Sequence, residues 1–229
     1  VTADKYGFSR EEMDAFATES AIRAQRAVSD GSFVDEIAPV TISSRRGDVT
    51  IEQDETPGLV SVDKIPKLRP AFRKDGTVTA ATSSSISDGA AAVVMMSETE
   101  AQKRGLQPIA KIVAHSVFAQ EPAWFTTAPV YALKKLHETL GWTPDDVDLY
   151  EINEAFAVVT MAALKDVGIS HDKVNVNGGA CALGHPIGAT GCRISVTLLH
   201  ALKSRGLKRG IATQCIGGGE ATAVAYEIL

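Results

Sequence analysis

The chain has 229 residues, enough for one large or two small domains, and 45% of them are hydrophobic, which is ample for a buried core. A net charge of −5 without a basic block argues against a nucleic-acid-binding surface, and no apolar run approaches the roughly 20 residues that span a bilayer. Three cysteines far apart do not make a disulfide framework, so we expect a reducing, cytoplasmic compartment and no membrane or nucleic-acid partner.

The first part of the chain joins one clear helix to a loop-rich stretch. Residues 9–31 predict an amphipathic helix, because Ser9 and Glu12 can form a capping box, apolar residues recur on one face and Gly31 can end the helix. From residue 32 to about residue 80, charges, prolines and glycines surround short extended pieces. We expect these residues to form a layer packed on a larger body.

Further along, apolar runs alternate with helical patterns. The continuous apolar run at residues 89–96 predicts a buried strand, and residues 97–105 predict a short capped helix. Residues 109–115 predict the next strand. A helix should then run from Thr127, as its N-cap, to Gly141.

The remainder of the chain continues this alternation. In chain order it predicts a strand at 147–152, a helix at 153–168, a strand at 174–176, a helix at 189–205 and a hairpin of two strands, 210–215 and 221–229. From residue 109 onward, this order predicts an α/β fold with three layers. A mixed β-sheet that finishes antiparallel should carry helices on both faces.

Three residues lie where predicted strands end, at the edge where open α/β sheets gather ligands. They are Asn153, His185 and Cys215. Taken singly, each has an ordinary structural explanation: an Asn can cap a helix, a His can be fixed by a turn, and a free Cys is often a small buried hydrophobe. Their shared location distinguishes them as candidates for chemistry.

Two other kinds of site fit the glycine-rich stretch GHPIGATG at 184–191 less well. Its spacing is neither G-x-G-x-x-G nor that of a P-loop, although glycine loops bind anions without these motifs, so a nucleotide-binding module stays open as an alternative. A metal site made of Cys181, His185 and Cys192 lacks the paired spacing of zinc motifs. We therefore expect no metal and no bound cofactor.

A histidine and a cysteine at one site suit carbonyl chemistry. A thiol reacts as its thiolate, a form that a neighbouring imidazole or a set of aligned N–H groups favours. The glycines that follow Cys215 free the backbone to aim its amides at a developing oxyanion. We expect Asn153, His185 and Cys215 to form one such site.

Three blocks of the sequence resemble the C-terminal signature motifs of thiolases. They are NEAFA at 153–157, NVNGGACALGHPIGATG at 175–191 and CIGGGEA at 215–221. The resemblance extends over essentially the whole chain. It implies a thiolase-like three-layer fold with a mixed β-sheet covered by helices, joined to a loop-rich α+β segment.

The resemblance also implies how the chain is divided, because thiolases consist of two similar halves. Residues 1–86 would be part of the loop domain, residues 87–108 the last strand and helix of the N-terminal half, and residues 109–229 the C-terminal domain. The rest of the N-terminal half, with its nucleophilic cysteine, is expected to be missing, because no cysteine here stands in that sequence context.

Each motif residue acquires a role from the resemblance. His185 would activate the nucleophilic cysteine, Cys215 would be the general acid and base, and Asn153 would hold a water that completes one oxyanion hole with His185. The backbone N–H of Gly217 would serve a second oxyanion hole. Coenzyme A and the acyl chain would be contacted by Ser84, Ala155, Phe156, Ala80 and Phe125.

The chain departs from the thiolase pattern at a few positions. TAATSSS at 79–85 replaces the commoner TAGNASG, and Phe125 stands where short-chain thiolases often have Met. Pro57 and Lys64 stand where an Arg and a Ser contact coenzyme A in some relatives. These differences concern substrate binding rather than the catalytic motifs.

The activity implied by the resemblance is that of an acetyl-CoA acetyltransferase-type thiolase, of which these residues form the C-terminal portion. Such an enzyme catalyses reversible Claisen condensation and thiolysis of short 3-ketoacyl-CoA in fatty acid metabolism. Its substrates are coenzyme A thioesters, and its partners would be the missing N-terminal half and further copies, as a dimer or tetramer. We expect these residues alone to be inactive.

Two alternatives remain at this point. A thiolase-like protein could bind acyl-CoA or a partner without catalysis. A ketosynthase-type condensing enzyme would carry a second catalytic histidine where Cys215 stands.

Overall fold

A computed structural model describes residues 1–229. The chain begins with helices α1 (Thr2–Tyr6) and α2 (Arg10–Ser29). The Ser9 side chain accepts a hydrogen bond from the Glu12 N–H at 3.1 Å, while the Glu12 carboxylate accepts one from the Ser9 N–H at 2.7 Å. The predicted capping box, and with it the predicted start of this helix, is confirmed.

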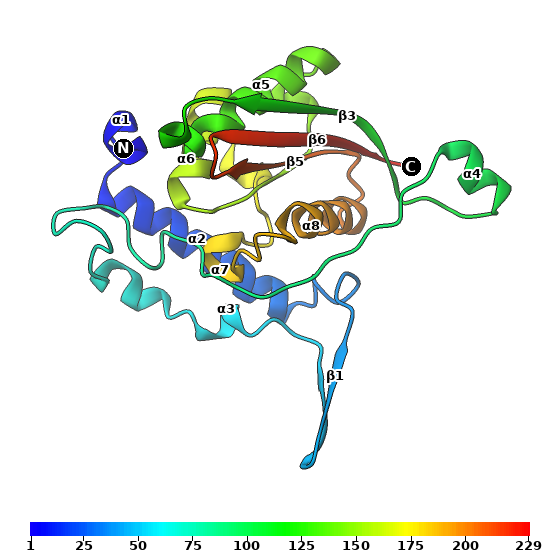
Figure 1. The fold of residues 1–229 in the computed structure, drawn as a ribbon, viewed down its shortest axis with the longest axis horizontal. Coiled ribbons are helices and arrows are strands. Elements are labelled where there is room, and N and C mark those ends of the chain that lie inside the picture. Colours follow the sequence, from blue (N-terminus) through cyan, green and yellow to red (C-terminus); the bar gives the residue numbers. More distant parts are fainter.

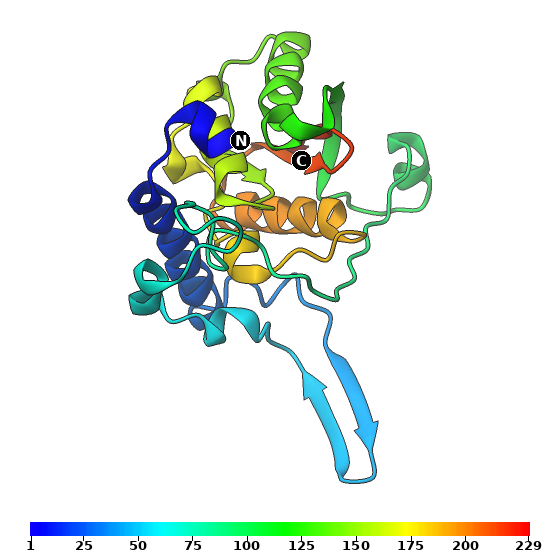
Figure 2. The same ribbon diagram turned by 60° about the vertical axis from the view of Figure 1, so that its left-hand side comes forward.

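The loop-rich stretch after α2 contains a protruding hairpin. Strands β1 (Val40–Ser44) and β2 (Gly47–Ile51) pair antiparallel, and every residue in them is exposed. The short helix α3 (Thr56–Leu59) and a 3-10 turn at Val62–Lys67 then return the chain to α2, against which both pack. Figures 1 and 2 show the hairpin extending away from the body of the molecule.

One four-stranded mixed sheet forms the centre of the body, with strand order β3-β6-β5-β4. Its strands are β3 (Ala110–Ala119), β4 (Leu149–Ile152), β5 (Arg209–Ile216) and β6 (Glu220–Ile228). Strand β4 runs parallel to β5, whereas β6 pairs antiparallel with both β5 and β3. The predicted mixed sheet with an antiparallel finish is confirmed, and the carboxyl ends of β4 and β5 meet at one edge.

Helices cover both faces of this sheet, as Figure 1 shows. On one face, α5 (Ala128–Leu140) and α6 (Ala157–Val167) enclose the larger core, which includes Tyr150. On the other face, α8 (Thr190–Ser204) covers a smaller core that includes Leu149. Successive residues of β4 thus point to opposite layers, as the strand period of two requires. The predicted three layers are confirmed, and no helix has the length and apolar character needed to cross a membrane.

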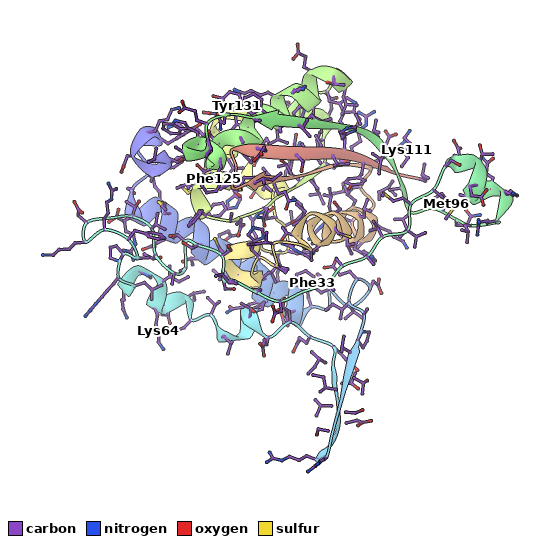
Figure 3. The ribbon with its side chains drawn as sticks, in the orientation of Figure 1. Phe33, Lys64, Met96, Lys111, Phe125 and Tyr131 are labelled. Carbon is purple, nitrogen blue, oxygen red and sulfur yellow. The ribbon has the colours of Figure 1, made fainter.

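The strand predicted at residues 89–96 is not formed. These residues have no regular structure, and Val94 and Met95 are 88% and 70% exposed. Continuous apolar sequence favours burial, but it cannot supply a neighbouring strand, and β3 pairs with β6 alone. The prediction is wrong for this reason. The helix predicted next is confirmed as α4 (Glu98–Lys103), and Figure 3 shows Met96 on the same outlying segment.

The strand predicted at residues 174–176 is also wrong. Val174 forms only an isolated bridge to Tyr150, and Asn175 has a φ of 47°, a left-handed conformation that interrupts an extended strand. The Asn175 side chain takes the place of strand backbone. Its Oδ1 accepts from the Ile152 N–H at 2.8 Å and its Nδ2 donates to the Ile152 carbonyl at 2.9 Å, so the edge of β4 stays paired.

Candidate active site

Asn153 and His185, predicted to share a site, lie next to each other. Asn153 follows β4 directly, and its N–H donates to the Thr213 carbonyl of β5 at 3.0 Å. Its side-chain Nδ2 lies 3.4 Å from Nε2 of His185. Helix α6 begins at Ala157 with Phe156 as its N-cap, so the helix start predicted at residue 153 is wrong and Asn153 caps nothing. Its side chain is therefore available to the site.

The backbone that carries His185 is held by a segment distant in sequence. His185 follows the short helix α7 (Ala180–Leu183), and its N–H donates to the Ser85 carbonyl at 3.1 Å. A parallel bridge joins His185 to Ile86. The intervening Gly184 has a φ of 85°, and a side chain on it would collide with the Ser87 hydroxyl. Position 184 consequently requires glycine.

The hydrogen bonds of Thr190 favour one tautomer of His185. Thr190 is fully buried, and its hydroxyl donates its only hydrogen to the Pro186 carbonyl at 3.0 Å. The Thr190 Oγ1 can then only accept from Nδ1 of His185, which lies 2.6 Å away. This arrangement favours the tautomer with its proton on Nδ1, in which Nε2 presents its lone pair to the Asn153 amide. Sequence reasoning missed Thr190, a hydroxyl five positions after the histidine.

The surroundings of His185 keep its imidazole neutral. Burial lowers its pKa, and the positive charge of Arg193 lowers it further. Arg193 itself belongs to α8, where it lies 3.8 Å from the buried carboxyl group of Glu151. A neutral imidazole with a lone pair at Nε2 can accept a proton from a thiol placed opposite it.

Cys215 lies on the strand next to Asn153. It is two positions beyond Thr213 on β5, pairs with Ala221 of β6 and is only 7% exposed. Burial raises the pKa of its thiol to about 11, while its own backbone N–H lowers it slightly. The thiol is therefore protonated at neutral pH and can donate a proton as it stands.

Gly217 lies in the turn that joins β5 to β6. It is exposed, nothing surrounds the position where a side chain would begin, and no backbone acceptor takes its N–H. The donor is therefore free to meet an oxygen from outside the chain.

Most residues predicted to contact substrate gather beside the Asn153 segment. The N–H and the Oγ of Ser84 donate to the Ala155 carbonyl at 3.1 and 3.2 Å, and a bridge joins Ser83 to Phe156. Ala80 is exposed at the start of the same segment. Ser84, Ala155 and Phe156 thus lie close together.

Phe125 and Phe156 line a cavity of about 420 Å³. Their rings meet edge to face with centroids 6.3 Å apart, and Figure 3 labels Phe125 on the turn before α5. Sequence reasoning missed the other residues of its wall. They include Thr2, Phe72, Thr77, Val78, Thr126 and Val158.

The remaining cysteines lie apart from this arrangement. The Cys181 N–H donates to the Glu154 carboxylate at 3.1 Å, and burial together with that negative charge raises the pKa of its thiol. Cys192 lies in the first turn of α8 and is partly exposed. No cluster of three or more His, Cys, Asp or Glu residues could hold a metal ion.

Two family models match the chain in succession. The model described as "Thiolase, N-terminal domain" matches residues 1–99, and the model described as "Thiolase, C-terminal domain" matches residues 106–228. The chain belongs to the thiolase family. An acetyl-CoA acetyltransferase of Chromobacterium violaceum is 51% identical over 98% of this chain, which covers 58% of that protein.

Solved thiolase structures share the fold. The acetyl-CoA acetyltransferase of Bacillus anthracis superposes with a TM-score of 0.96 at 45% identity, over all of this chain and 58% of that one. The Acat5 thiolase of Ascaris suum, solved in complex with coenzyme A, gives a TM-score of 0.88 at 40% identity, again over all of this chain and 58% of that one. The chain thus spans less than two thirds of these relatives.

Proposed function

We propose that these residues form the base and oxyanion side of an acetyl-CoA acetyltransferase-type thiolase site. The observation that carries the proposal is the chain of contacts from Thr190 through His185 to Asn153. It sets a neutral imidazole with its Nε2 lone pair beside an amide donor, and Cys215 lies near the end of the neighbouring strand β5. A general base and a donor for an oxyanion are the groups that acyl transfer between thioesters requires.

Each group has a distinct task in this proposal. The His185 Nε2 takes the proton of an attacking thiol, and afterwards His185 and Asn153 face the thioester oxygen on which negative charge develops. Cys215 moves the proton at the α-carbon, and the Gly217 N–H stabilises a second oxyanion. Removing one oxyanion donor typically costs about 3 kcal/mol of transition-state stabilisation.

The acyl-accepting thiol is proposed to come from residues outside these 229. The thiols of Cys181 and Cys215 have raised pKa values, and neither has an imidazole within hydrogen-bond distance. Cys192 lies on α8 without a base bonded to its sulfur. The chain alone should therefore not turn over.

The substrate is proposed to be a short 3-ketoacyl-CoA or a pair of acetyl-CoA molecules. The segment around Ser84 and Ala155 offers backbone and hydroxyl groups beside the site, and the cavity lined by Phe125 and Phe156 offers an apolar wall. A homo-oligomeric assembly, a cytoplasmic location and a role in fatty acid metabolism belong to the same proposal and rest on the family alone.

A chimera tests this function. It joins the part of the Bacillus anthracis protein that this chain does not cover to these 229 residues. We expect the chimera to cleave acetoacetyl-CoA with added coenzyme A, and His185→Ala and Asn153→Ala to reduce that rate. A folded chimera that binds coenzyme A but shows no cleavage would instead favour a non-catalytic acyl-CoA-binding protein.

A further inference from the structure

Glu154, the residue after Asn153, carries a buried carboxylate that the proposed chemistry does not use. It is 1% exposed and accepts three hydrogen bonds. The Ser20 hydroxyl donates to its Oε2 at 2.7 Å, the Cys181 N–H donates to the same oxygen at 3.1 Å, and the Asn175 Nδ2 donates to its Oε1 at 2.8 Å. Such a buried group needs an explanation, because burying a carboxylate is costly.

The partners of Glu154 fit the ionised form of the carboxyl group. All three donate to it, and the Cys181 N–H and the Asn175 Nδ2 can only donate, so a proton on the carboxyl group could meet no acceptor except the Ser20 oxygen. Burial raises the pKa of Glu154, whereas the donated hydrogen bonds and the charge of Arg193 lower it. No cation touches the carboxylate, so its hydrogen bonds must offset most of the cost of burial.

These hydrogen bonds reach both segments that carry the candidate catalytic residues. Asn175 uses one Nδ2 hydrogen for Glu154 and the other for the Ile152 carbonyl, directly before Asn153. On the other side, the Cys181 N–H belongs to α7, the helix that leads to His185. One carboxylate therefore fixes the backbone on both sides of the 3.4 Å contact between Asn153 and His185.

The same group ties these segments to α2 in the loop-rich layer. Ser20, on α2, donates to Glu154 and accepts from the Gly179 N–H at 3.0 Å. The helix approaches so closely that a side chain at Gly178 would lie 2.7 Å from Ala24, and one at Gly179 would overlap the Glu154 carboxylate. The two glycines of the NGG sequence thus make room for this junction.

We propose that Glu154 is a positioning residue, whose hydrogen bonds to Ser20, Asn175 and Cys181 hold Asn153 and His185 at their working separation and anchor both to α2. The inference rests on the proposed function, because it concerns the same site. It assigns Glu154 no contact with substrate.

Two substitutions in the 229-residue chain test it by NMR. Glu154→Gln removes the negative charge and one of the two acceptor oxygens, and should speed amide exchange at Cys181 at least about tenfold, as expected when a buried N–H loses its charged acceptor. Ser20→Ala should do the same at Gly179. Both should also shift the His185 Hε1 resonance, which a role confined to overall stability would leave in place.

Ser195→Ala is the matched control, since Ser195 is a buried helical serine that bonds Gly191 and Tyr226 instead. Exchange at Ile211 in β5 serves as the reference for global unfolding. If Ser20→Ala changes Gly179 exchange and the His185 resonance no more than Ser195→Ala does, the proposal is wrong, whether or not Glu154→Gln folds. Neither readout needs catalysis, so this outcome and an inactive chimera are independent results.

Discussion

Replacing Thr190 by valine should weaken the preference of His185 for the Nδ1–H tautomer. The two side chains have nearly the same shape, and Thr190 is fully buried, so no water takes the place of the hydroxyl. The Pro186 carbonyl keeps the N–H groups of Ala189 and Thr190 at 2.8 and 2.9 Å, so the loop backbone should stay in place. The His185 Nδ1–H, however, would lose its acceptor.

The size of the effect follows from that single lost hydrogen bond. A buried donor without a partner costs about 1–3 kcal/mol, and every 1.4 kcal/mol is a tenfold change in an equilibrium. The ratio of the Nδ1–H to the Nε2–H tautomer should therefore fall at least about fivefold. A proton on Nε2 removes the lone pair that faces Asn153, so base catalysis should fall with it.

The assay is nitrogen-15 NMR of histidine-labelled chain above the pKa of His185, where the two ring nitrogens report where the proton lies. Thr190→Ser is the control, because it retains the hydroxyl and should retain the Nδ1–H tautomer. The reasoning is refuted if the unsubstituted chain carries its proton on Nε2, or if Thr190→Val leaves the ratio unchanged.

Three further results are expected. In the chimera, Cys215→Ser should leave acylation of the nucleophile largely intact while condensation falls at least about 100-fold, as rapid-quench measurements of the two steps can show. The free energy of unfolding should fall as the pH rises from about 7 to 8, because burial raises the pKa of Glu36 to about 7 and of Glu151 to about 8. Over this range the folded chain holds protons that the unfolded chain has released, whereas the lowered pKa values of His137, His171 and His185 oppose the effect below about pH 7. Urea titrations measure the fall, and Glu36→Gln should make it smaller. Iodoacetamide at about pH 7.5 should label Cys192 before Cys215, because a pKa of about 11 leaves roughly one Cys215 side chain in three thousand as thiolate. Peptide mass spectrometry can follow the labelling of each cysteine.

Each of these has a contrary outcome. Equal loss of acylation and condensation would make Cys215 structural. Stability that stays level or rises between pH 7 and 8 would contradict the raised pKa values of Glu36 and Glu151. Labelling of Cys215 ahead of Cys192 would show that its thiol is neither buried nor protonated.

The sequence predicts the elements whose signals are local. Helix α2 begins at the Ser9 capping box, α5 ends at Gly141 in a left-handed conformation, and the final hairpin turns at a run of glycines. The strand predicted at residues 89–96 is wrong, because an apolar run forms a strand only beside a neighbouring strand, and no local pattern reveals whether one is there. Residues 174–176 fail because a side chain replaces the strand backbone at Asn175.

The candidate site divides in the same way. Asn153 and Cys215 can be found from the sequence, since they lie at the carboxyl ends of the parallel strands β4 and β5. His185 follows α7 rather than a strand, so only the glycine-rich motif around it identifies it. The groups that hold these site residues in place could not be found from the sequence. Thr190 acts on His185 through a hydrogen bond to its Nδ1, and Ser20 bonds Glu154, which is 134 positions away in the sequence. Only the folded chain reveals these contacts.

The central claim is that His185 serves a thiol from outside these 229 residues. Peptide mass spectrometry after incubation with acetyl-CoA tests it most directly, on the chain alone and on the chimera. We expect no acetyl group on the chain alone, and in the chimera one acetyl group on a cysteine of the Bacillus anthracis part, lost with His185→Ala. Turnover by the chain alone, with an acetyl group on Cys181, Cys192 or Cys215, would contradict the claim.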